Sequence, residues 1–181
     1  MGKIQQVSYY FRFLFQLVFL ALPILLGLFW INAPIPLGFP KAGFTASFIP
    51  DGIEILHVLS PFTKFSGFLI CLIPLFFTEL VLYFLVKLFN LYEKAEIFSI
   101  KNVTYIKKIG YALLLGQLVN PLFDALMTFN LTWGNPHGHR MIGITIDGTN
   151  IGIILGALMT ILISWIMAEG CKLREEQQLT I

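Results

Sequence analysis

Two carboxylic acids, Glu79 and Asp124, stand inside long apolar runs of the sequence, where an ionisable side chain is costly. Such residues suggest a function by default, here a polar lining that conducts a proton or a small solute. The competing interpretation is structural, with a neutral Glu79 donating a hydrogen bond to a neighbouring helix. A single glutamate with no carboxylate at its own depth is weak support for transport, so the structural interpretation is favoured.

Three polar residues of one apolar run, Gln117, Asn120 and Asp124, recur at intervals of three and four residues, so a helix would place them on one face. Pro121 is expected to kink that helix and to free a carbonyl group. From the helical rise per residue, Glu79 lies ~12 Å and Gln117 ~14 Å from the inner membrane boundary. These two side chains should therefore meet at one level, with Asp124 ~10 Å further outward.

Other residues that commonly carry chemistry are few. No glycine-rich phosphate loop, hydrolase elbow or nucleophile–base pair of useful spacing occurs, so an enzyme is not expected. His57, His137 and His139 could bind zinc or copper, but solvated turn histidines are the simpler interpretation, and neither a metal nor another cofactor is predicted. Cys71 and Cys171 are expected to lie ~30 Å apart, too far for a disulfide.

The composition indicates a membrane protein. Hydrophobic residues make up 57% of the 181 residues and charged residues only 12%, against about 25% charged residues in an average soluble domain. A soluble enzyme domain and a disordered chain are therefore excluded. Four apolar runs reach the roughly 20 residues that a bilayer requires; they cover about 13–31, 66–88, 109–129 and 149–168. The predicted fold class is an all-α membrane protein, a four-transmembrane-helix bundle that forms a single domain.

Basic residues are distributed unevenly between the two sides of the predicted spans. One side collects nine of them: Lys3, Arg12, Lys87, Lys94, Lys101, Lys107, Lys108, Lys172 and Arg174. The other side has Lys41, Lys64 and Arg140. The positive-inside rule therefore places both termini, the connector 89–108 and the tail 169–181 in the cytoplasm, and the segments 32–65 and 130–148 outside. The net charge of +2 is too small to suggest direct binding of nucleic acid.

The outer segments are predicted to form a small cap that contains some β structure. Residues 126–133 and 140–146 have strand-like composition and flank a turn rich in glycine, asparagine and proline, which suggests a β-hairpin. Residues 43–49 could add a third strand. A short helix is expected over 51–59, ended by Pro61.

A stripe of small residues runs along the last span. Its members recur at every fourth position: Gly148, Gly152, Gly156, Thr160, Ser164 and Ala168. Small residues at this spacing let helix backbones approach closely in membranes. Packing inside the bundle is the favoured interpretation, and a homodimer contact through this span is the alternative.

The connector and the tail carry side chains that could bind a cytosolic protein. The candidates combine aromatic and charged types: Tyr92, Glu93, Lys94, Glu96, Phe98, Arg174, Glu175 and Glu176. Ser99 is a suitable N-cap for the third helix, and the tail is expected to extend the last helix past the membrane. The simpler interpretations are an interfacial anchor for the connector and a solvated helix end for the tail.

Two motifs in these stretches are distinctive, namely Glu-Lys-x-Glu-Ile-Phe-Ser over 93–99 and Glu-Glu-Gln-x-Leu-Thr over 175–180. With them, nearly the whole chain resembles a bacterial family of small four-span membrane proteins that is classed as a domain of unknown function. The resemblance implies the bacterial inner membrane and a Cro-like helix-turn-helix regulator as partner, because members are often encoded beside one. It also implies that glycine is commoner where this chain has Ala95, and it supplies no catalytic residues.

The expected function is a non-enzymatic membrane sensor or anchor whose connector and tail engage a cytosolic transcriptional regulator. The alternative is a small transporter or channel that uses the intramembrane polar residues Glu79, Gln117, Asn120 and Asp124. The lipid bilayer is the other expected partner.

Overall fold

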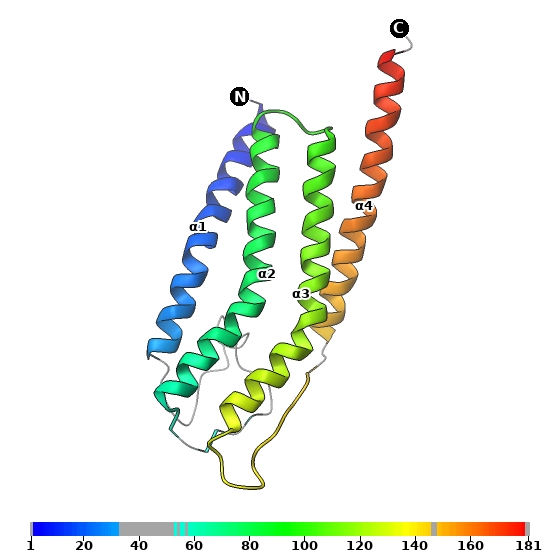
Figure 1. Cartoon of the computed structure of the whole chain (residues 1–181). Helices are drawn as coiled ribbons and strands as arrows, with labels where there is room; N and C mark the ends of the chain where they lie inside the picture. The colour runs from blue at the N-terminus through cyan, green and yellow to red at the C-terminus, as the bar shows by residue number, and fades with distance from the viewer. Residues whose placement is uncertain (1, 33–52, 54, 57, 146–147, 180–181) are drawn as a thin grey trace. The chain divides into compact units, whose positions relative to one another are not determined.

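The computed structural model describes residues 2–32, 53, 55–56, 58–145 and 148–179, and all regular structure among them is helical. Helix α1 covers Lys3–Asn32, α2 covers Pro61–Glu93, α3 covers Ile100–Thr132 and α4 covers Gly148–Leu179 (Figure 1). All four are long and apolar enough to cross a membrane. The four predicted helices are therefore confirmed, and each extends beyond its apolar run into the flanking polar residues.

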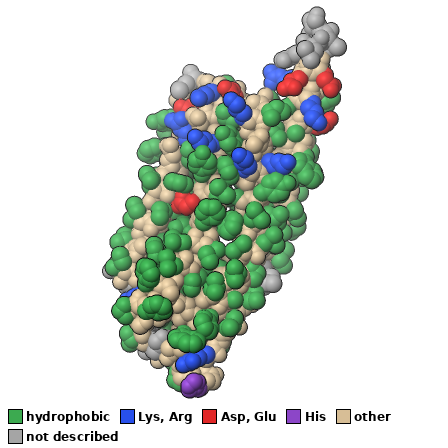
Figure 2. Space-filling view, viewed as in Figure 1, with side chains coloured by type: hydrophobic (Ala, Val, Ile, Leu, Met, Phe, Trp, Pro, Cys, Tyr) green, Lys and Arg blue, Asp and Glu red, His purple; other side chains and the backbone are tan. Residues whose placement is uncertain are grey.

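Large apolar side chains cover the outside of these helices (Figure 2). Leu20 is 65% exposed, Ile31 75% and Phe62 78%. Side chains of this kind at so many exposed positions would be unfavourable in water, but they match the hydrocarbon chains of a bilayer. The chain is accordingly a multi-pass membrane protein in its composition, its helix lengths and its surface.

The helices contribute to two compact units. Unit 1 comprises Met1–Leu20, Phe77–Gln117 and Gly148–Ile181, and unit 2 comprises Ala21–Phe76 and Leu118–Asp147. Three helices contribute to both units, and each carries one proline close to the division: Pro23, Pro74 and Pro121. A proline removes the backbone hydrogen bond to the residue four positions earlier, so each of these helices is locally weakened there.

Unit 2 has an apolar core built from three helices. Its buried side chains come from α1, α2, α3 and the segment before α2: Leu26, Trp30, Leu59, Cys71, Leu75, Phe123, Met127 and Leu131. The α3 members recur at every fourth residue, which is the spacing of one helix face. Gly67 of α2 lies directly against the indole ring of Trp30, so a Cβ atom at this position would overlap the ring.

In unit 1, α1 and α2 are joined by an ion pair and by aromatic stacking. The Arg12 guanidinium lies 2.7 Å from a carboxylate oxygen of Glu93 and donates a hydrogen bond of 3.1 Å to Asn90. One residue away, the ring of Phe11 stacks on that of Phe89 with 5.3 Å between their centroids. Because α1 and α2 are antiparallel neighbours here, these contacts define their register.

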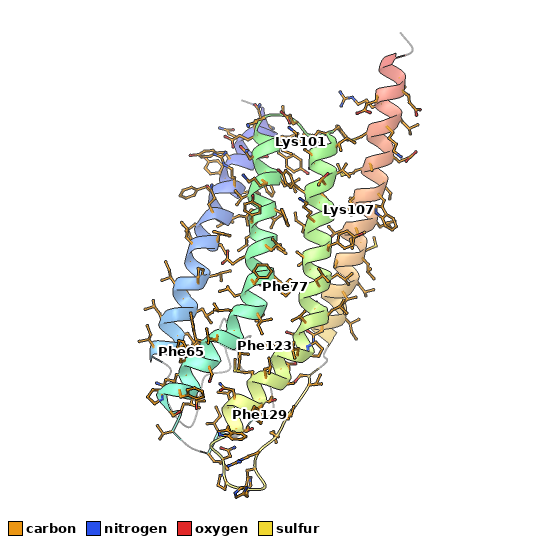
Figure 3. The ribbon with its side chains drawn as sticks, in the orientation of Figure 1. Phe65, Phe77, Lys101, Lys107, Phe123 and Phe129 are labelled. Carbon is orange, nitrogen blue, oxygen red and sulfur yellow. The ribbon has the colours of Figure 1, made fainter. Side chains whose placement is uncertain are left out.

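The helix α3 meets α2 and α4 in unit 1 at two glycines. A Cβ atom on Gly116 would lie 3.2 Å from the Cβ atom of Phe77 in α2 (Figure 3). A Cβ atom on Gly110 would lie 2.6 Å from Ile161 and 3.1 Å from the carbonyl oxygen of Ala157, both in α4. The glycines that permit close approach between helices are therefore Gly110 and Gly116 of α3. The glycines in the N-terminal part of α4 have no such neighbour among the described residues.

The predicted β-hairpin in the outer cap is wrong. Residues 126–133 are not a strand, because α3 continues to Thr132 and places Met127 and Leu131 in the core of unit 2. The residues of 140–146 that the structure describes are non-helical but have no strand partner among the described residues. The proposed third strand at 43–49 lies outside the described residues.

The predicted helix over 51–59 is also wrong for the residues that the structure describes, which are 53, 55–56 and 58–59. Pro61 begins α2 instead of ending a helix, since proline is favoured in the first turn, where its missing N–H costs nothing. Ser60 is the N-cap, and its hydroxyl accepts a hydrogen bond of 3.1 Å from the N–H of Thr63.

We expect Gly67→Ala to lower the free energy of unfolding by about 1–3 kcal/mol, because the added methyl group overpacks the core against Trp30. Gly27→Ala in α1 is the matched control, since nothing lies within 4 Å of its added Cβ atom and alanine is the better helix former. Unfolding by sodium dodecyl sulfate in mixed micelles measures both variants. Equal stability of the two would contradict the close packing at Gly67.

Candidate functional site

Asp124 is buried, and its carboxylate supports a neighbouring stretch of backbone. Its Oδ2 atom accepts a hydrogen bond of 3.0 Å from the N–H of Thr145, and its side chain is 5% exposed. Asp124 belongs to unit 2, together with Asn120, which is half-buried. The carboxylate therefore has a hydrogen-bond partner in the backbone that follows α3.

The same arrangement repeats along α3. The hydroxyl of Thr128 accepts from the N–H of Gly143 at 2.9 Å, and that of Thr132 accepts from the N–H of Met141 at 3.2 Å. Beyond the helix, Nδ2 of Asn135 donates to the carbonyl oxygen of His139 at 3.0 Å. Four polar side chains thus hold residues 139–145, which we call the strap.

The regular spacing of these bonds has a geometric cause. Four residues of an α-helix advance by about 6 Å, and two residues of an extended chain advance by about 6.6 Å. Positions 124, 128 and 132 of α3 therefore stay in step with the N–H groups of 145, 143 and 141. Polar residues at every fourth position of a helix, followed by an extended segment, are the sequence signal that would have revealed Thr128 and Thr132.

Glu79 and Gln117 belong to unit 1, and their side chains present a different situation. Both carboxylate oxygens of Glu79 and the Oε1 atom of Gln117 are screened from solvent and have no hydrogen-bond partner among the described residues. The contact of Phe77 with Gly116 brings the neighbouring stretches of α2 and α3 together. No interhelical hydrogen bond from Glu79 is seen, so the structural interpretation of this residue lacks its partner.

The small-residue stripe of α4 has two different halves. Towards its C-terminal end, Ser164 is fully buried, and Thr160 and Ala168 are half-buried. Gly152 and Gly156 are exposed, and no other described residue lies within 4 Å of a Cβ atom placed on them or on Gly148. The described residues therefore give these three glycines no packing partner, because a four-residue spacing drifts around the helix and leaves the face that contacts α3. Packing of this half of the stripe inside the bundle stays a prediction.

The connector between α2 and α3 is an ordered turn. Helix α2 ends with Ala95 in the left-handed region at φ 60°, and the N–H of Glu96 bonds to the carbonyl oxygen of Leu91 at 3.0 Å. Glycine adopts this φ with less strain than alanine does. Ser99 caps α3 by accepting from the N–H of Asn102 at 3.3 Å, and the buried Asn102 side chain donates to the Ile97 carbonyl. The predicted N-cap is confirmed.

The connector and the α4 tail lie side by side in unit 1. The Arg174 guanidinium lies 6.0 Å from the ring centroid of Phe98, and Cys171 is buried beside the connector. A cavity of about 500 Å³ lies between them; its lining comes from residues 95–100, Cys171, Arg174 and Glu175. The predicted extension of the last helix into the tail is confirmed, since α4 continues to Leu179.

The candidate partner-binding residues divide into two groups. Tyr92 and Glu93 contact side chains of unit 1, with the Tyr92 ring edge-on to Phe89 and Glu93 paired with Arg12. The remaining candidates are exposed: Lys94, Glu96, Phe98, Arg174, Glu175 and Glu176. We call five of these residues, namely Lys94, Glu96, Phe98, Arg174 and Glu175, the connector–tail surface.

The histidines and cysteines form neither a metal site nor a disulfide in the described part of the chain. His137 and His139 are exposed, and no group of three metal-ligating side chains occurs among the described residues; His57 is not one of them. Cys71 and Cys171 are both free and buried.

The comparisons with known proteins assign a family. The model of the family described as Protein of unknown function (DUF2975) matches residues 27–181, so the chain belongs to that family. No curated protein and no solved structure matches the chain significantly.

Replacing Asp124 by alanine leaves the N–H of Thr145 without its carboxylate acceptor, so we expect the free energy of unfolding to fall by about 1–3 kcal/mol. Asp124→Asn keeps an acceptor oxygen and should lower the free energy of unfolding by less. The control is Thr104→Ala in α3, since the exposed Thr104 hydroxyl donates a hydrogen bond to Ile100 of its own helix. Detergent unfolding compares the three, and similar losses for Asp124→Ala and Thr104→Ala would contradict the role of the strap bonds.

Proposed function

We propose that this member of the DUF2975 family is a non-enzymatic membrane anchor or sensor that holds a cytosolic transcriptional regulator at the connector–tail surface. The observation that carries the proposal is the contact of two segments far apart in the sequence. The connector and the tail together line one cavity, and Arg174 lies over the exposed ring of Phe98. A surface made by joining two segments is suited to recognising a folded partner.

The composition of the connector–tail surface also supports the proposal. Arginine and aromatic side chains are enriched among residues that dominate binding energies at protein interfaces. Phe98 is 64% exposed, and Glu96, Arg174 and Glu175 line the same cavity with charges of both signs. Such a mixture favours a protein partner over the uniformly negative surface of a nucleic acid.

We place the connector–tail surface in the cytoplasm of a bacterium, with both termini, on the basis of charge. All nine basic residues that the sequence assigns to the inner side belong to unit 1. Of the three assigned to the other side, Lys64 and Arg140 belong to unit 2, and Lys41 lies outside the described residues. The positive-inside rule then orients unit 1 towards the cytoplasm. A helix-turn-helix protein is the partner that the family resemblance suggests.

The test is co-purification from detergent-solubilised native membranes, with the affinity tag in the outer segment 130–148 so that the connector and the tail stay free. A helix-turn-helix protein identified by mass spectrometry should co-purify, and Phe98→Ala or Arg174→Ala should weaken its affinity about 30-fold, as loss of an interface hot spot does. Phe62→Ala is the matched control, because Phe62 is an exposed phenylalanine of unit 2.

The proposal fails if no cytosolic DNA-binding protein co-purifies with the wild-type protein. It also fails if Phe62→Ala weakens recovery as much as Phe98→Ala does. Truncation after Ala168 is a coarser test, because it also removes the buried Cys171.

A small proton transporter is a second candidate, and one observation favours it. The carboxylate of Glu79 and the amide oxygen of Gln117 are screened from solvent and lack partners among the described residues. If Glu79 carries protons, proteoliposomes should acidify under a membrane potential faster than protein-free vesicles, and Glu79→Gln should remove the difference. Glu175→Gln, in the tail, is the control. Equal acidification of wild-type and protein-free vesicles would exclude this candidate.

A further inference from the structure

An apolar groove lies between α1 and α2 within unit 1. It has a volume of about 520 Å³, and its walls include Phe13, Leu17 and Leu20 from α1 and Tyr83 and Val86 from α2. The volume falls in the range of about 300–1,000 Å³ that is typical of small-molecule sites. Leu17 is 54% exposed and Leu20 65% exposed, so the groove is open at the surface of the helices.

The groove is formed by two helices that are apolar enough to span a membrane. An open apolar groove at this position faces lipid, and lipid acyl chains are the abundant apolar molecules there. The chemistry of the groove alone would accept the chain of any phospholipid. The headgroup must therefore be inferred from the polar side chains at its edge.

One cation lies at that edge. The Nζ atom of Lys87 lies 5.5 Å from the centroid of the Tyr83 ring, which forms part of the groove wall. Lys87 is exposed and has no acidic partner among the described residues. Arg12, a cation of the neighbouring helix α1, is paired with Glu93 at 2.7 Å. The charge of Lys87 is therefore available to an external anion.

The register of α1 and α2 places a polar side chain opposite Lys87. Arg12 bonds to Asn90, and the two helices are antiparallel, so one turn further along α1 lies Gln16 and one turn back along α2 lies Val86–Lys87. Gln16 lines the groove, is exposed, and carries an amide that can donate and accept hydrogen bonds. Leu20, one turn beyond Gln16, continues the groove with apolar surface.

We propose that this groove binds one anionic glycerophospholipid, in the leaflet at the basic end of unit 1. Its phosphate lies at Lys87, its ester groups lie near Gln16, and one acyl chain lies along Leu17, Leu20 and Tyr83. A basic side chain beside a groove between membrane-spanning helices is the arrangement by which membrane proteins retain anionic lipids. The proposal is independent of the partner at the connector–tail surface, and either can fail without the other.

The experiment is native mass spectrometry of the full chain in detergent, with equal amounts of phosphatidylglycerol and phosphatidylcholine that carry identical acyl chains. We expect wild-type protein to retain phosphatidylglycerol in preference. Lys87→Gln should reduce that preference about fivefold, the effect of one basic residue near an anionic lipid surface. Leu20→Trp, which fills the groove from an exposed position, should reduce retention of both lipids.

Lys107→Gln is the matched control. Lys107 is also exposed, and its Nζ atom also lies over an aromatic ring, 5.9 Å from the centroid of Tyr111, but it belongs to α3 and does not line the groove (Figure 3). Equal retention of the two lipids by wild-type protein would overturn the proposal. So would equal effects of Lys107→Gln and Lys87→Gln, or unchanged phosphatidylglycerol retention in Leu20→Trp with an unchanged melting temperature.

Discussion

Lipid offers no hydrogen bonds, so any non-helical backbone beside a membrane-spanning helix must find its partners within the protein. The strap, residues 139–145, meets that constraint through the polar face of α3. Asp124, Thr128 and Thr132 belong to a candidate span, and each accepts a hydrogen bond from one N–H group of the strap. The strap can therefore lie along α3 without forming a sheet.

The hydrogen bonds of the strap give a structural role to a polar residue that the sequence analysis linked to transport. A carboxylate in an apolar run suggests transport, but Asp124 already has a structural task. Glu79 has none among the described residues, because both of its oxygens lack partners there. Both acids lie in apolar runs of the sequence, but only the carboxylate of Asp124 has a hydrogen-bond partner among the described residues.

In unit 1, charged side chains join the helices to one another, whereas in unit 2 the helices pack through an apolar core and α3 binds the strap through hydrogen bonds. The Arg12–Glu93 pair joins α1 to α2, Arg174 joins the tail to the connector through Phe98, and Lys87 stands beside the groove with no acidic partner among the described residues. Cations with internal partners stabilise the helix arrangement. Lys87, which has no acidic partner among the described residues, is available to molecules outside the chain, which is why the proposed lipid contact falls on unit 1.

The sequence by itself determined the four helices and the separation of basic residues, because apolar run length and charge are properties of each segment alone. The caps at Ser60 and Ser99 are equally local, although the first was missed because Pro61 was interpreted as a helix end. The hairpin at 126–146 was wrong because composition does not reveal that Met127 and Leu131 belong to a helical core. Tertiary structure decided three other features: the face of α4 that packs, the partner of Asp124, and the contact between the connector and the tail. Each depends on contacts between residues far apart in the chain.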